Sequence, residues 1–243
     1  GSVGKLFMTF VLKQSSNVFD LEMNPSISDL RQAYERGENI VHLLKNNNPE
    51  RDRAEIIEIA YDIQAGSYTD YALENPKLLN RYASEIYELS APHFADGDVI
   101  LDCGAGELTT LSALSQHLPQ KCELLACDIS LSRLRVGRLF ADRNMRHDLR
   151  ENLRLFVADM VRLPLADSSV DVVFTSHALE PNHGREQQLL KELLRISRRK
   201  LVLFEPCWEH ADKAVRTRMQ KHGYIRDLPT HIQAAGGSLV SVK

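Results

Sequence analysis

Cysteine is scarce in this sequence, and no stretch stays apolar for long. Only four cysteines occur among the 243 residues, at positions 103, 122, 127 and 207, and none has the CxxC spacing. We therefore expect buried, reduced thiols in a cytoplasmic protein, without a disulfide framework or a zinc site. No apolar run reaches the ~20 residues that span a bilayer. Thr9 and Lys13 interrupt the apolar start too early for a signal peptide.

A surplus of basic charge is also missing. Thirty Lys and Arg residues face thirty-three Asp and Glu residues, which gives a net charge of -3. General nucleic-acid binders usually carry a basic excess, so we do not expect nucleic acid as a partner. Arginines gather at 131–150 and 195–200. We interpret them as a solvated surface, with a polyanionic acceptor such as RNA as the alternative.

The first 97 residues favour helices. Helix-start residues, glycines and prolines predict helices ending at Arg36, over Glu38–Lys45, from Pro49 to about Ala65 and from Pro76 to Leu89. We expect this segment, 1–97, to fold as a helical N-terminal cap over the second domain, 98–243.

From Asp98 onward, short apolar runs alternate with amphipathic helices. The predicted strands are Val99–Leu101, Glu123–Cys127, Leu153–Val157, Val170–Phe174 and Leu201–Phe204, with a possible sixth at Ser238–Val242. This alternation indicates the α/β class. We predict a doubly wound, mainly parallel sheet with helices on both faces.

Glycine and acidic residues follow three of these strands where the strands end. In doubly wound sheets, ligands lie beyond these ends, near the point where strand order reverses. Gly104 and Gly106 let the backbone approach a ligand closely. Asp128 can accept hydrogen bonds from ribose hydroxyls, and Asp159 can accept one from the amine of adenine. The predicted site for an adenosine with a charged tail comprises Asp102, Gly104, Ala105, Gly106, Asp128, Ile129, Asp159 and Met160.

The stretch Val99–Gly106 resembles the first motif of class I S-adenosylmethionine-dependent methyltransferases, a hydrophobic strand followed by Asp-x-Gly-x-Gly. Residues 125–130 are similar to the ribose-binding segment of that family, and 158–173 to its adenine segment and fourth strand. The resemblance implies a methyltransferase with S-adenosylmethionine as cofactor, bound by the residues above and by Ser176 at the end of the fourth strand. Residues 60–68 resemble the entry helix of small-molecule members, which implies that Tyr68 contacts the methionine end of the cofactor.

NAD is the competing cofactor. A dinucleotide fingerprint needs a glycine three positions after Gly106, where this sequence has Thr109. Asp102 would also repel a pyrophosphate at the adjacent turn. Members of the resembling family often have a glycine at the position of Leu108, so this residue is a departure from their pattern.

Three side chains after the fourth strand are candidates for contact with the methyl acceptor. His177, Glu180 and His183 can act as a general base or anchor the acceptor. A histidine that merely hydrogen-bonds locally is the alternative. We predict no metal site, because ligands from a single loop rarely converge without help.

The sequence therefore favours methyl transfer to oxygen or nitrogen of a small molecule. Methylation of RNA or protein, and a non-catalytic cofactor-binding module, stay open as alternatives. Members of the resembling family end in two antiparallel strands, and only one candidate is present here. We expect residues 6–12 or a second copy of the chain, as a homodimer, to cover the edge beside the fifth strand.

Overall fold

The structure, a computed structural model, describes residues 25–242 and contains one five-stranded sheet. Its strands are β1 (Val99–Cys103), β2 (Glu123–Asp128), β3 (Leu153–Val157), β4 (Val170–Ser176) and β5 (Ser197–Phe204). They lie in the order β3-β2-β1-β4-β5, and every pair is parallel. The predicted α/β class and sheet are confirmed. The strand order reverses at β1, which places the end of β1 beside the end of β4.

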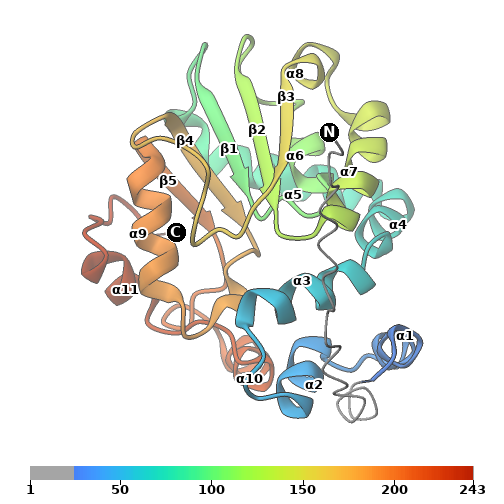
Figure 1. The fold of residues 1–243 in the computed structure, drawn as a ribbon. Helices are drawn as coiled ribbons and strands as arrows, with labels where there is room; N and C mark the ends of the chain where they lie inside the picture. The colour runs from blue at the N-terminus through green and yellow to red at the C-terminus, as the bar shows by residue number, and fades with distance from the viewer. Residues whose placement is uncertain (1–24, 243) are drawn as a thin grey trace, which may run out of the picture.

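Alternate residues of the strands face two hydrophobic cores. Ile100 and Val172 pack on one face with residues of α5 (Pro76–Ser90), α6 (Thr109–Leu114), α7 (Leu131–Asn144) and α8 (His147–Glu151). Leu101 and Val173 pack on the other face with α9 (Glu186–Ile196) and α11 (Leu228–Ala234). Figure 1 shows these two groups of helices on opposite sides of the sheet. Both faces are therefore covered, as a parallel sheet requires.

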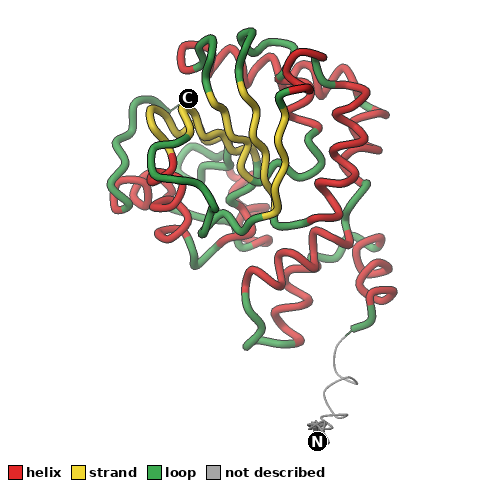
Figure 2. The backbone as a smooth tube through the Cα atoms, turned by 45° about the horizontal axis from the view of Figure 1, so that its top comes forward, coloured by secondary structure: helices red, strands yellow, loops and turns green. Residues whose placement is uncertain are grey.

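Three N-terminal helices enclose a smaller core of their own. They are α1 (Ile27–Glu35), α2 (Ile40–Asn47) and α3 (Arg53–Ile63), and Leu30, Leu44 and Ile56 are buried between them. Figures 1 and 2 show this group at one end of the sheet, with α10 (Lys213–His222) nearby in Figure 1. Asp62 ties α3 to the core by accepting hydrogen bonds from the Ser130 hydroxyl and, at 3.3 Å, from the Ser132 N–H.

Several predicted helix boundaries were wrong. The third helix begins at Arg53 rather than Pro49, because the Asp52 carboxylate caps it by accepting from Ala54 and Glu55. The structure contains an additional helix, α4 (Ser67–Glu74), that we did not predict. Residues 131–150, where arginines gather, form two helices, because extended backbone at Met145 separates α7 from α8. The helices ending near Arg36 and starting at Pro76 are confirmed.

The possible sixth strand is also wrong. Residues 238–242 pair with no strand and instead run beside β5, where they line a cavity. Just before this segment, the Gly237 N–H donates a hydrogen bond to the Ile232 carbonyl at the end of α11. Residues 6–12, the predicted cover for this edge, lie outside the described residues.

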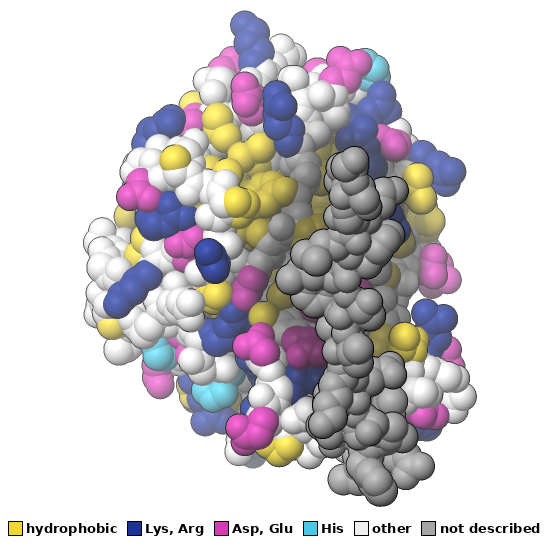
Figure 3. Space-filling model, viewed as in Figure 1, with side chains coloured by type: hydrophobic (Ala, Val, Ile, Leu, Met, Phe, Trp, Pro, Cys, Tyr) yellow, Lys and Arg dark blue, Asp and Glu magenta, His cyan; other side chains and the backbone are white. Residues whose placement is uncertain are grey.

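No helix among residues 25–242 is long and apolar enough to cross a membrane. On the face seen in Figure 3, acidic and basic side chains alternate without a continuous patch of one sign. Three of the cysteines are buried thiols and Cys207 is partly exposed; none forms a disulfide.

Candidate functional site

A cavity of about 840 Å³ lies at the carboxyl ends of the strands. Its floor comes from the turns after β1, β2, β3 and β4, and its walls come from the N-terminal helices and α10. Nine of the predicted cofactor-binding residues line it: Tyr68, Gly104, Ala105, Gly106, Asp128, Ile129, Asp159, Met160 and Ser176. The parallel register brings them together, since Cys103 pairs with Cys127 and Asp128 with Val157.

The turn after β1 forms a cradle in which two positions require glycine. Gly104 and Gly106 have φ angles of 80° and 52°, in the left-handed region that favours glycine. A Cβ on Gly104 would overlap Ala178 Cβ and lie 3.2 Å from Met160 Cε. Leu108 also has a positive φ of 55°. The backbone here therefore keeps the glycine-type turn even where a side chain is present.

Asp128 organises the same turn. One carboxylate oxygen accepts from the Gly106 N–H at 2.8 Å, and the other accepts from the Ser130 N–H at 2.9 Å. Each oxygen keeps a second lone pair that can accept a ribose hydroxyl. Asp159, across the cavity, pairs with Arg185 and accepts from the Val161 N–H. The bare glycine backbone and these two acids fit a nucleoside ligand.

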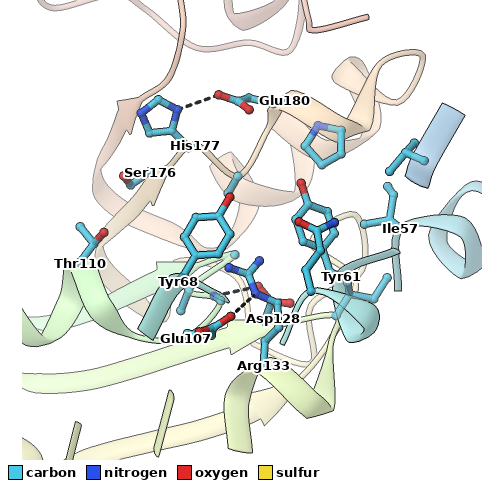
Figure 4. A pocket seen from close by; sticks show the side chains of 18 of the residues that line it. Ile57, Tyr61, Tyr68, Glu107, Thr110, Asp128, Arg133, Ser176, His177 and Glu180 are labelled. Carbon is cyan, nitrogen blue, oxygen red and sulfur yellow. Dashed lines mark hydrogen bonds and ion pairs between the residues drawn. The ribbon is translucent and has the colours of Figure 1, made fainter. Parts of the chain in front are cut away.

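A buried charged cluster closes the cavity on the side of α4. Glu107 accepts hydrogen bonds from the Gly66 and Thr69 N–H groups, at 3.1 and 2.7 Å, and so caps α4. Arg133, from α7, lies 3.5 Å from the same carboxylate. Its guanidinium stacks between Tyr61 and Tyr68, 5.0 and 4.6 Å from the ring centroids. Figure 4 shows this guanidinium reaching into the cavity between the two rings.

A histidine–glutamate pair stands at the opposite side of the cavity in Figure 4. His177 Nδ1 lies 2.7 Å from Glu180 Oε1. The hydrogen bond to Glu180 raises the pKa of His177, although burial opposes the shift. His177 has a φ of 53°, a strained backbone for a residue other than glycine. The chain turns at this residue, directly after β4. The His177 N–H still donates a hydrogen bond to the Phe204 carbonyl of β5.

Glu205, at the end of β5, holds the turn that carries this pair. It accepts hydrogen bonds from the Thr175 hydroxyl and from the Ala178 and Leu179 N–H groups. Burial raises the pKa of Glu205 to about 7. Beside it, the Tyr82 hydroxyl lies 2.7 Å from the Ser176 hydroxyl. Burial also raises the pKa of Tyr82.

A second cavity of about 810 Å³ adjoins the first. Its lining includes the length of β5, parts of α5 and α10, and the C-terminal residues 236–242. Five residues line both cavities: Tyr82, His177, Glu180, Arg218 and Tyr224. The His177–Glu180 pair therefore lies on the wall between two spaces that are each large enough for a small organic molecule.

Two predicted site residues do not line either cavity. Asp102 is buried within the sheet, behind the glycine turn. His183 points to solvent, with a side chain 64% exposed, and bonds to Glu186 at 2.9 Å. Among residues 25–242, no group of three or more His, Cys, Asp or Glu side chains is placed to hold a metal ion.

The structure adds site residues that sequence reasoning missed. Arg133 and Glu107 were absent from the predicted site, and Arg133 was assigned to a solvated helix face. The sequence contained one signal for Arg133, namely its position. Arg133 follows the Ser130 cap by one helical turn and therefore lies close to the end of β2. Glu107 carried no signal, since its partners belong to the unpredicted helix α4.

Comparisons with known proteins agree with this geometry. Residues 100–200 match the family model described as "Methyltransferase domain". The chain is 34% identical over 136 residues to the malonyl-[acyl-carrier protein] O-methyltransferase of Marinomonas sp. (strain MWYL1), covering 56% of this chain and 45% of that protein. It is 30% identical over 153 residues to the demethylmenaquinone methyltransferase of Thermobifida fusca (strain YX), covering 60% and 61%. The matches therefore span about half the length of these relatives.

Among solved structures, the chain resembles geranyl diphosphate C-methyltransferase from Streptomyces coelicolor A3(2) in fold. The TM-score is 0.50 at 14% identity, over 64% of this chain and 59% of that one. The sheet order, the glycine cradle and the matched family model agree on one assignment. Residues 100–200 of this chain match a methyltransferase domain, and the residues that line the cavity fit S-adenosylmethionine as its cofactor.

Proposed function

We propose that this protein transfers a methyl group to an oxygen or nitrogen atom of a small-molecule acceptor, with His177 as the general base. The observation that carries the proposal is the His177–Glu180 pair on the wall between the two cavities. One cavity is lined by the cofactor motif residues, and the other gives room for the body of an acceptor.

Bound S-adenosylmethionine supplies a methyl group that a sulfonium has already activated. The protein has to align the acceptor and take up its proton. With Nδ1–H donated to Glu180, neutral His177 keeps a lone pair on Nε2. The glycine turn, Asp128 and Asp159 would hold the cofactor, and His177 would deprotonate the acceptor oxygen or nitrogen as it takes the methyl group. The acceptor's proton goes to Nε2.

Neighbouring residues support this role. Glu205 fixes the turn from Thr175 to Leu179, so the position of the His177 ring is set by backbone hydrogen bonds. The Tyr82 and Ser176 hydroxyls face the same space and can orient a polar acceptor group. We further propose that the N-terminal helices act as an acceptor-selecting cap, because Tyr61 and Tyr68 line the cavity from α3 and α4.

The proposal is tested by measuring S-adenosylhomocysteine release with a panel of acceptors. The panel contains small hydroxyl and amine compounds, acyl thioesters, RNA and protein. We expect turnover with a small-molecule pool. We expect H177Q to lower kcat about 100-fold, because a positioned general base usually contributes at least this factor to the rate. The matched control is H183Q, an exposed histidine that also bonds to a glutamate three residues on. Turnover only with RNA or protein, no turnover with any acceptor, or equal loss in H177Q and H183Q would each contradict the proposal.

A further inference from the structure

Arg133 is a buried cation with few hydrogen-bond partners among residues 25–242. The residue is only 8% exposed, and its Nε has no hydrogen-bond partner in this part of the chain. Its Nη1 and Nη2 groups lie on the side of the cavity that Arg133 lines. A guanidinium carries five N–H donors, and a buried donor that is left without an acceptor is unfavourable. The arrangement calls for an anionic acceptor from outside the chain.

Glu107 does not fill this need. Its carboxylate lies 3.5 Å from Arg133 Nε, and both of its oxygens already accept backbone N–H groups at the start of α4. It balances the charge of Arg133 at one edge of the guanidinium. The Nη1 and Nη2 edge faces the cavity instead, which Arg133 lines.

The guanidinium is fixed in place before any ligand binds. Tyr61 and Tyr68 hold its two faces at stacking distances, which orients the fork of N–H donors. A Cβ on Gly106 would lie 2.5 Å from Nη2 and 3.2 Å from Nη1. The fork therefore lies directly over the glycine turn, at the point where the backbone lets a ligand approach.

We propose that Arg133 binds the carboxylate at the amino-acid end of S-adenosylmethionine. The cofactor has a single anionic group, that carboxylate, and a guanidinium fork matches a carboxylate with two parallel hydrogen bonds. Its nucleoside end presents hydroxyl and amine donors, which suit the acids Asp128 and Asp159 rather than a cation. The inference concerns the cofactor site alone, and its test does not depend on which acceptor the protein methylates.

The test compares two ligands by calorimetry on the full chain. One is S-adenosylhomocysteine, and the other is its decarboxylated form, which keeps the amine and the nucleoside. We expect wild-type protein to bind the carboxylate form about 10- to 100-fold more tightly, as for other hydrogen bonds to charged groups. In R133Q this preference should fall to within about 2-fold, while affinity for the decarboxylated ligand stays unchanged.

R138Q is the matched control, because Arg138 lies on the same helix in an exposed ion pair with Asp142. It should keep the wild-type preference. If R133Q does not fold, R133K keeps the charge without the fork and should show a reduced preference. A wild-type protein that binds both ligands equally, a variant that weakens both by the same factor, or an unchanged preference in R133Q or R133K would overturn the inference.

Discussion

Burial governs the ionisation of Asp102. Its pKa rises to about 8, first because the sheet desolvates it and then because Asp128 and Glu205 lie near. An Asp in an unfolded chain titrates near pH 3.9 by general reference values, roughly four units lower. Between these pH values the folded state holds a proton that the unfolded state lacks. Stability is therefore lost as the pH rises from about 4 to about 8.

The variant D102N removes this titration while keeping a similar neutral side chain. We expect the melting temperature of D102N, measured without ligand, to exceed that of wild type by a margin that grows from pH 5 to pH 8. The matching difference in the free energy of unfolding should grow by at most about 1.4 kcal/mol per pH unit. D142N, which alters an exposed acid, should show no such trend. A margin that stays constant with pH contradicts the assignment.

The Glu180 hydrogen bond raises the pKa of His177, and this shift sets a pH dependence for the proposed reaction. A base must be neutral, so the rate should rise with pH through the pKa of His177. E180Q removes the raising charge, and the rising limb of kcat/KM should move to lower pH. E186Q, beside the exposed His183, should leave the limb in place. A limb that does not move in E180Q identifies a different titrating group.

At the residue scale, the sequence predicted the positions that follow strand ends. Gly104, Asp128 and Asp159 needed only the register of parallel strands to meet at one cavity. Arg133 could not be found this way, because its burial depends on rings from two other helices. His183 shares its residue type and its spacing to a glutamate with His177. Both side chains are more than half exposed, and what distinguishes His177 is that it lines both cavities.

At the scale of elements, α4 depends on a side chain from the turn after β1. Its N-cap is Gly66, which has no side chain, and Glu107 supplies the missing acceptor from the turn after β1. The negative carboxylate also suits the positive end of the helix. An element whose cap lies 41 residues away in the chain leaves no local start signal, and α4 was not predicted.

E107Q should therefore destabilise the fold. A glutamine would turn an amide N–H toward a backbone N–H, and Arg133 would lose its counter-charge. We expect a loss of about 1–3 kcal/mol in the free energy of unfolding, measured in urea. E123Q, at the exposed start of β2, is the control and should change stability by less than about 0.5 kcal/mol. Equal effects of the two substitutions contradict the anchoring role.

Regular elements with local signals were predicted well. The five strands are short apolar runs, and α5 begins at a proline in its first turn. Residues 238–242 share the apolar character of the strands, yet they pair with none. Strand formation there depends on a partner at the edge of β5, and a pattern within five residues cannot supply that information.

At the scale of the molecule, the cofactor domain and the N-terminal helices meet around one cavity. Binding of S-adenosylhomocysteine should slow backbone amide exchange in α3, α4 and residues 104–110, since these segments line the cavity. Helix α9, packed on the far face of the sheet, should keep its exchange rate. Hydrogen-exchange mass spectrometry measures the exchange rates of all these segments in one experiment. Equal protection of α9 and α4 would contradict a ligand that is held between the sheet and the N-terminal helices.

The wall shared by the two cavities makes their contents interdependent. A molecule that displaces Tyr82 or Arg218 from one side reshapes the space on the other, so each occupant alters the affinity of its neighbour by the same factor. Substitutions in residues 238–242, remote from the glycine turn, should then leave cofactor affinity untouched in binary complexes. They should change it once an acceptor fills the cavity along β5.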